Sequence, residues 1–371
     1  MNTLLARITL FAYFFTLTIS SVAQSANLIV GTYTSKGSKG IYVFNFDTAT
    51  GKATELSHTD SAINPSFLTI SKDKQFVYAV NEINEGQVSA YALKENKLVL
   101  LQQKITKGAN PCHIVLSPNQ RALFVANYSG GSLTSFHRSA DGRLSNARQI
   151  IEHKGSSVNT IRQEKAHVHG SFIAPAGNYL LTTDLGMDET TIYPYSPTGT
   201  PPLNITNASV IKAKPGSGPR HLTFSNNGRF IYILEELSGT VSVYNFINGK
   251  AKFLQRVLLH PAELKENFGS ADIHLSPDGL FLYATNRGSE NNIVKLPVLT
   301  NGKLNEYKIQ YFSTKGIGPR NFTISADGKW LLVANQQTDS IVIFKRNILT
   351  GDLVATNNSI KVSMPVCLVL F

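Results

Sequence analysis

A 17-residue pattern that occurs six times constrains the fold of this chain more than any other feature. Each copy holds an apolar run of about five residues, a polar turn such as SPDG or SADG, and a second apolar run. Apolar runs rich in Val, Ile, Leu and Phe on either side of a tight turn indicate a β-hairpin. The copies align without gaps at 66–82, 112–128, 169–185, 220–236, 271–287 and 320–336.

Further apolar segments follow the hairpins and complete a larger unit. After the fourth hairpin come TVSVYNF (240–246), a turn and AKFLQRV (251–257). Four antiparallel strands in a repeat of roughly 50 residues are typical of one blade of a β-propeller. No segment has convincing helical periodicity, so we predict an all-β chain.

The two ends of the chain supply the missing parts of one more blade. NLIVGTYTSKG (27–37) matches the second half of the pattern, whereas MPVCLVLF (364–371) resembles only its first strand. Pairing the two would close the ring and leave no exposed sheet edge. We therefore predict a seven-bladed β-propeller with four antiparallel strands per blade, in one domain over residues 24–371.

The first 23 residues differ from the rest. Arg7 precedes an apolar run over 8–19, and a small-residue segment follows with a cleavage site after Ala23. This run is shorter than the about 20 residues that span a bilayer, and the arrangement is typical of a secretory signal peptide. We expect a periplasmic or secreted protein without a stable membrane span; the alternative is an uncleaved membrane anchor.

Charge and cysteine content exclude some classes of function. The formal net charge of +11 suggests an anionic substrate or a polyanion only weakly, and a solvated basic surface explains it better. Lys and Arg are scattered without basic runs or interleaved aromatic residues, so we expect no nucleic-acid partner. Cys112 and Cys367 lie on non-adjacent units, and we expect neither a disulfide framework nor a nucleophilic cysteine.

The repeat also predicts where the polar residues lie in the fold. The first strand of each blade lines the central channel, and its start lies beside the end of the second strand, because the two form one hairpin. Equivalent positions should therefore form rings around one mouth: Ser66, Cys112, His169, Arg220, Ala271, Arg320; then Phe67, His113, Gly170, His221, Asp272, Asn321; and Glu82, Tyr128, Leu185, Glu236, Arg287, Gln336 with Tyr33.

A different polar residue stands at this mouth in nearly every unit, whereas the apolar positions are uniform. Such convergence of unlike side chains is how function is usually added to a fold. The longest connections, 151–166 and 258–270, emerge at the same mouth and could wall or cover the pocket.

Several motifs are similar to those of a known family. GTYTSKGSKGIYVF, RQEKAHVH, DLGMDE, GPRHLTF and ADIHLSPDGLFLYATNRG extend over the mature chain. The chain resembles the seven-bladed propeller lactonases, which include propeller-type 6-phosphogluconolactonases and fungal carboxy-cis,cis-muconate cyclases. The resemblance implies an active site of His169, Glu236, Arg220 and Arg287, the positions that the rings also contain. The family's usual Asn is Glu235 here, which implies a more acidic pocket.

Hydrolysis of a lactone needs an activated water and a stabilised oxyanion. We expect His169 or Glu236 to act as general base, and Arg220 and Arg287 to bind anionic groups and the oxyanion. We expect no cofactor and no metal ion. The residues that we expect to bind substrate are His113, His167, His221, Arg320, Tyr128 and Asp272.

Structural roles compete with these assignments. Arg220 and Glu236 could form an ion pair across their hairpin, and His113, His221 and Asp272 could hydrogen-bond to loops. His167 and His169 are two apart on one strand and share a face, so either could be structural. The residues that end the second strands, Asn127, Asp184, Asn286 and Asn335, are better explained as turn-forming.

Three functions remain open. The first is a monomeric, metal-independent lactonase acting on an anionic sugar-acid lactone, with a muconate-type lactonising cyclase as a variant. The second is a metal-dependent gluconolactonase with Ca²⁺ or Zn²⁺ held by Asn, Asp and Glu side chains. The third is a periplasmic propeller that binds a ligand without catalysis.

Overall fold

The computed structural model describes residues 25–60, 62–261, 263–264 and 268–371. The predicted signal peptide, residues 1–23, lies outside these ranges, so the prediction stays untested. Within the described part of the chain, no helix has the length and apolar character needed to cross a membrane.

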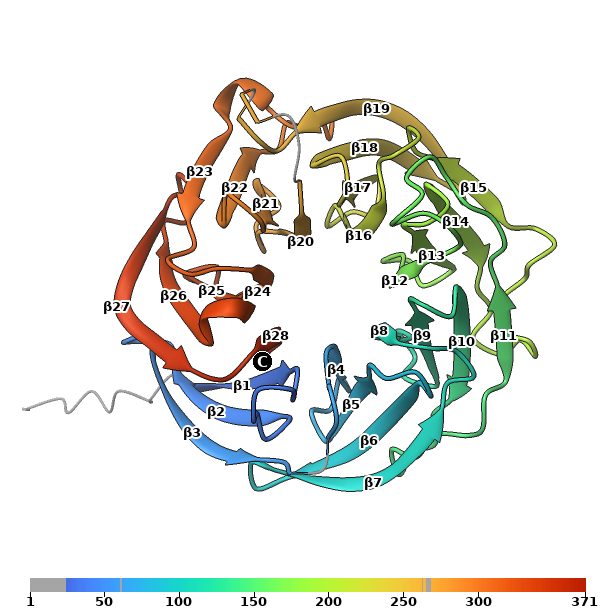
Figure 1. Ribbon diagram of the computed structural model, residues 1–371, viewed down its shortest axis with the longest axis horizontal. Coiled ribbons are helices and arrows are strands. Elements are labelled where there is room, and N and C mark those ends of the chain that lie inside the picture. Colours follow the sequence, from blue (N-terminus) through green and yellow to red (C-terminus); the bar gives the residue numbers. More distant parts are fainter. Residues whose placement is uncertain (1–24, 61, 262, 265–267) are drawn as a thin grey trace, which may run out of the picture.

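Seven four-stranded antiparallel sheets stand around a central channel, as Figure 1 shows, and the predicted fold is confirmed. The inner strands are β4 (Leu68–Ile70), β8 (Pro111–Leu116), β12 (Val168–Ile173), β16 (Pro219–Phe224), β20 (Ser270–Leu275), β24 (Pro319–Ile324) and β28 (Pro365–Leu370). The second strands are β1 (Ser25–Thr32), β5 (Phe76–Asn81), β9 (Ala122–Asn127), β13 (Tyr179–Asp184), β17 (Phe230–Glu235), β21 (Phe281–Asn286) and β25 (Trp330–Asn335).

The remaining strands complete each blade toward the perimeter. The third strands are β2 (Tyr42–Asp47), β6 (Gln87–Lys94), β10 (Ser132–His137), β14 (Glu189–Pro194), β18 (Thr240–Ile247), β22 (Asn292–Pro297) and β26 (Ser340–Arg346). The outer strands are β3 (Lys52–His58), β7 (Lys97–Ile105), β11 (Gln149–Glu152), β15 (Ser209–Lys212), β19 (Lys250–Leu258), β23 (Gln310–Ser313) and β27 (Leu353–Lys361). Two 3₁₀ turns are described, η1 (Glu306–Lys308) and η2 (Gln336–Thr338).

The ring closes through the two ends of the chain. Strand β28 pairs antiparallel with β1, with Leu28 opposite Leu370, and Figure 1 shows the blue and red ends of the ribbon side by side. Leu28 and Phe44 of this blade share one core with Trp330 and Leu332 of the preceding blade. The closing blade is therefore packed like the others, as the terminal motifs predicted.

The turn inside each repeat explains why the hairpins recur. In the unit at 271–287, Ser276 Oγ lies 2.5 Å from Asp278 Oδ1, and the N–H of Leu280 donates to the same carboxylate. Gly279 adopts φ +72°, a left-handed conformation that glycine tolerates at little cost. Lys74 and Gln120 take positive φ at the same turn position, so the turn geometry is kept even where glycine is absent.

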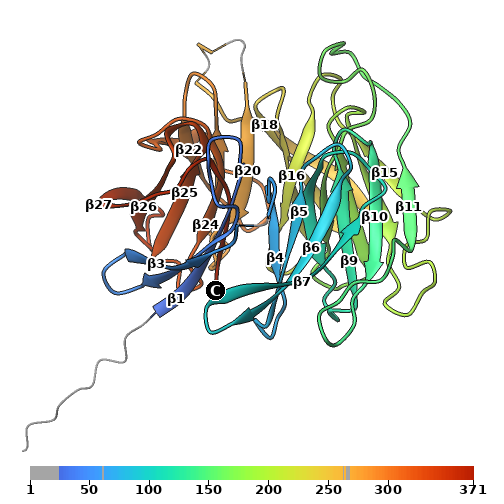
Figure 2. The same cartoon turned by 60° about the horizontal axis from the view of Figure 1, so that its bottom comes forward.

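Burial follows the layer order of the blades. The second and third strands are buried on both faces by the adjacent blades, whereas outer strands such as β3 alternate between exposed and half-buried residues. Such packing fixes the inner strands around the channel. Figure 2 shows the connection that follows β11 rising beyond one face of the ring.

Candidate active site

Most inner strands, though not β4, begin with a bulge that takes a side chain out of the regular alternation. In β12 the register with β13 shifts between Val168 and Gly170, and β16 shifts in the same way between Pro219 and His221. A bulge residue leaves the hydrogen-bond ladder and its side chain is re-aimed. The residues skipped in this way are Cys112, His169, Arg220 and Arg320, with Ala271 and Asp272 together in β20.

The second strands deliver a further set of side chains at the same level. The residue that directly follows each second strand is anchored by a hydrogen bond from its backbone N–H. The N–H of Glu236 donates to Gly218 O at 2.7 Å, and that of Arg287 donates to Gly269 O at 3.1 Å. Glu82 and Tyr128 are anchored equivalently. Their side chains start from rigid positions.

These two sets surround a cavity of about 350 Å³. Five of the residues predicted to act on substrate lie on its wall, and Arg220 lies directly behind Glu236. Sequence reasoning did not select four further wall residues, of which Arg162 belongs to the connection expected to cover the pocket. The lining residues are Tyr33, Glu82, Cys112, Tyr128, Arg162, His169, Glu236, Arg287 and Arg320.

Glu236 is the centre of the cationic side of this pocket. Its Oε2 lies 2.9 Å from Arg220 Nε and 3.2 Å from Arg287 Nη2, and its Oε1 accepts a hydrogen bond from Arg162 at 2.9 Å. Burial would raise the pKa of Glu236, but the three arginines outweigh it and lower the pKa to about 2. The carboxylate is therefore ionised and a weak base.

His169 faces this carboxylate. Its Nε2 lies 4.0 Å from Glu236 Oε2, and its ring meets Tyr128 edge to face at 5.3 Å between centroids. Burial, with the positive charge of Arg220, holds the pKa of His169 well below its ordinary 6.5. The imidazole is neutral at neutral pH and can accept a proton.

Cys112 also lies on the wall, but in a structural setting. Its thiol donates to the carbonyl of His169 at 3.3 Å and lies 3.8 Å from Nδ1 of that ring. Burial raises the pKa of the thiol, so the reactive thiolate is disfavoured. Both Cys112 and Cys367 are free and buried, as expected.

The opposite side of the pocket contains Arg320. Its guanidinium lies over the ring of Tyr33 at 5.3 Å, and Tyr33 donates its hydroxyl to Glu82 Oε2 at 2.8 Å. Counting Arg220, four guanidinium groups face the two carboxylates of Glu82 and Glu236. The pocket therefore carries an excess of positive charge that suits an anionic ligand.

Three predicted substrate ligands, His113, His221 and Asp272, are buried and lie outside the cavity wall. His221 Nδ1 donates to Asp272 Oδ1 at 2.8 Å, and the pKa of Asp272 is held well below its usual range, by neighbouring imidazoles against the effect of burial. His113 packs between the rings of Phe67 and Phe172. None of the three residues is on the wall of the cavity, so their assignment as substrate ligands stays a prediction.

Two expectations need correction. His167 stacks on Tyr128 at 4.4 Å and contacts Glu164 with Nε2 at 3.1 Å, away from the cavity wall. Glu235 accepts hydrogen bonds from Thr240 and Ser242 inside its blade. Adjacent residues of a strand point to opposite faces, so Glu235 does not make the pocket more acidic.

The polar residues that end the second strands stabilise turns, as predicted. Asn127 Nδ2 donates to Ser132 and Thr134, each at 3.1 Å. Asp184 Oδ1 accepts the backbone N–H groups of His167, Gly186 and Met187. None of these contacts directs an oxygen ligand into the channel.

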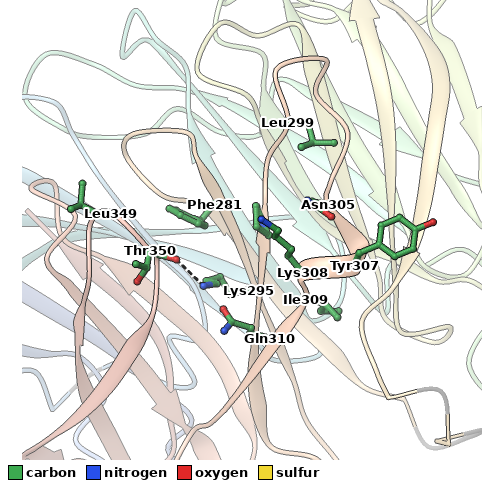
Figure 3. Close-up of a pocket in the computed structure, with 11 residues that line it drawn as sticks. Phe281, Lys295, Leu299, Asn305, Tyr307, Lys308, Ile309, Gln310, Leu349 and Thr350 are labelled. Carbon is green, nitrogen blue, oxygen red and sulfur yellow. Dashed lines mark hydrogen bonds between the residues drawn. The ribbon is translucent and has the colours of Figure 1, made fainter.

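A second, larger hollow of about 650 Å³ lies on the outer side of two neighbouring blades. Figure 3 shows Lys295 directed toward the backbone oxygen of Thr350, to which it donates at 2.7 Å. Asp352 neutralises this lysine at 2.6 Å, and the other lining residues are mostly apolar or amide side chains. This hollow lacks the acid–base groups that the channel pocket contains.

Fold and site together define a closed seven-bladed propeller with a cationic, histidine-containing pocket on its channel. The chain belongs to the lactonase family with a seven-bladed β-propeller, whose model matches residues 27–370. It is 38% identical to the 6-phosphogluconolactonase of Formosa agariphila over 88% of this chain and 94% of that protein.

Solved structures agree with this membership. The periplasmic gluconolactonase of Pseudomonas aeruginosa is 36% identical and superposes with a TM-score of 0.86 over 93% of this chain and 99% of the other. A Bacteroides fragilis protein of known crystal structure is 40% identical in sequence to this chain and superposes with a TM-score of 0.87. The match covers 95% of this chain and 99% of the other.

Proposed function

We propose that this protein hydrolyses the lactone of a sugar acid at the mouth of its channel, without a metal ion, through His169, Glu236, Arg220 and Arg287. The observation that carries this proposal is the convergence of a neutral histidine and a carboxylate, 4.0 Å apart, with several arginines in one pocket. The names of the relatives, 6-phosphogluconolactonase and periplasmic gluconolactonase, support it.

His169 is the general base. Both oxygens of Glu236 are held by arginines, which makes this carboxylate the poorer proton acceptor, whereas the neutral imidazole of His169 can take a proton. His169 accepts a proton from the attacking water as the water oxygen bonds to the lactone carbonyl carbon. Glu236 remains ionised and holds the arginines in place.

The arginines stabilise the oxyanion that this attack creates. Arg287 donates Nε to Gly269 O at 3.0 Å and contacts Glu236 with Nη2, which leaves Nη1 for a ligand within the described part of the site. Arg220 reinforces the positive field from behind. The ring C–O bond then breaks, and protonated His169 returns its proton to the leaving alkoxide.

The proposal includes a location outside the cytoplasm. The apolar run over 8–19 with its small-residue cleavage site supports export, as does the kinship with a periplasmic gluconolactonase. The substrate class is therefore an aldonolactone with or without a phosphate group, and we propose that the protein acts as a monomer.

A metal-dependent mechanism fits the residues less well. Among the described residues, no group of three or more His, Cys, Asp or Glu side chains is arranged to hold a metal ion. The strand-end amides and carboxylate that could have formed such a ring are bonded to neighbouring turns.

The test is hydrolysis of a panel of glucono-1,5-lactone, its 6-phosphate and a muconolactone, with and without EDTA, corrected for spontaneous opening. We expect hydrolysis that EDTA leaves unchanged, and a fall in kcat of at least about tenfold for H169A. His58 on the outer strand β3 offers a control, H58A, which should keep wild-type rates. Absence of hydrolysis across the panel would leave a ligand-binding propeller instead.

A further inference from the structure

Arg162 is the only wall arginine that comes from outside the repeated hairpins among the described residues. It lies in the connection between β11 and β12, on a turn in which Asn159 Oδ1 accepts the N–H groups of Ile161 and Arg162, each at 3.1 Å. The next residue, Gln163, is fully buried and donates to Leu185 O at 2.9 Å. The backbone under Arg162 is thus fixed, and only its side chain is free to move.

The side chain of Arg162 is also the most accessible of the three arginines around Glu236. It is 41% exposed, compared with 22% for Arg287 and 3% for Arg220. Arg287 and Arg220 are additionally tied to backbone carbonyls, Gly269 O and Ala271 O respectively. The hydrogen bonds of Arg162 within the described residues go to Glu236 Oε1 at 2.9 Å and to Tyr128 Oη at 3.3 Å.

These contacts allow Arg162 to exchange its partner. Arg220 and Arg287 both lie at Glu236 Oε2, whereas Arg162 contacts Oε1. When Arg162 turns away, two arginines still compensate the carboxylate, and Oε1 becomes free to accept a hydrogen bond from a sugar hydroxyl. A guanidinium group at the entrance can then bind a phosphate or carboxylate through two parallel N–H donors.

We propose that Arg162 is the specificity-determining residue of this site: it exchanges Glu236 for the anionic substituent of an incoming lactone and thereby favours anionic over neutral substrates. This rests on the proposed lactone hydrolysis and adds to it a residue that selects the substrate. Arg320, the wall arginine that stacks on Tyr33, is the competing anion ligand, and the experiment separates the two.

The experiment measures kcat/KM for glucono-1,5-lactone and for its 6-phosphate with wild type, R162Q, R162K and R320Q. The ratio of the phosphorylated to the neutral substrate should fall roughly tenfold or more in R162Q. R162K, which keeps the charge but lacks the planar fork, should recover part of it. Lys154 lies in the same connection but off the cavity wall, and its side chain is 83% exposed, so K154Q controls for loss of one positive charge from this connection.

A second measurement is calorimetric titration with inorganic phosphate, which requires no catalysis. Binding that weakens about tenfold in R162Q but not in K154Q supports the proposal. Unchanged phosphate binding, a ratio that falls only in R320Q, or equal losses on both substrates in R162Q would each overturn it. If wild type opens neither lactone, the proposed function fails, and the phosphate titration still decides whether Arg162 binds the anion.

Discussion

Replacing Glu236 by glutamine should destabilise the protein in a way that depends on pH. The pKa of Glu236 falls from 4.5 to about 2 on folding, because the charges of three arginines outweigh the effect of burial. At about 1.4 kcal/mol per pKa unit, this difference corresponds to about 3 kcal/mol of folding free energy at neutral pH. For a domain of this size, the melting temperature of E236Q should fall by about 4 °C.

The sign of the pH dependence follows from the depressed pKa. A carboxylate with a lowered pKa in the folded state stabilises it fully above the unfolded value of about 4.5, and this contribution is lost as the pH falls toward 2. The difference in urea-unfolding midpoint between wild type and E236Q should therefore be largest near pH 7 and shrink below pH 4.5. Glu306 is exposed, so E306Q is a matched control. An E236Q protein as stable as wild type at pH 7, or a gap that widens in acid, would refute this reasoning.

Two further predictions concern catalysis. Burial and the charge of Arg220 keep the pKa of His169 well below 6.5. The kcat for lactone opening should therefore be constant above about pH 6.5 and fall only below it. A fall in kcat on the acid side with its midpoint above about pH 7 would contradict His169 as the base. A methyl group at Gly186 would overlap the carbonyl of Lys165 and displace the connection that carries Arg162. G186A should therefore raise KM for an anionic lactone roughly tenfold. An unchanged KM in steady-state assays would show that the position of this connection does not affect substrate binding.

The fold could be predicted from the sequence because its determinants are local. The turn at Ser276, Asp278 and Gly279 is encoded within a few residues, and the alternation of apolar residues specifies the strands on either side of it. Each end of the chain holds only one strand of a hairpin, and the two strands complement each other. This was enough to predict the pairing of β1 with β28.

The site could be predicted only in part, because ring positions do not reveal depth or direction. His221 follows Arg220 immediately, yet across the bulge between Pro219 and His221 the two side chains have different partners: Arg220 contacts Glu236, whereas His221 donates to Asp272. A bulge is a property of the pairing between two strands, and the amino-acid sequence of a single repeat does not show where it occurs. Arg162 has no equivalent position in the other blades, so the repeat contained no signal for it.

The bulges explain why chemistry gathers at this level of the propeller. In the second and third strands, by contrast, most side chains are buried between adjacent blades, and a polar substitution there would leave a buried group without a partner. At the bulge and at the residue after the second strand, the side chain leaves the ladder while its backbone stays hydrogen-bonded, as at Glu236 and Gly218. These positions can therefore change without disturbing the core, and His169, Arg220 and Glu236 stand there for the same physical reason.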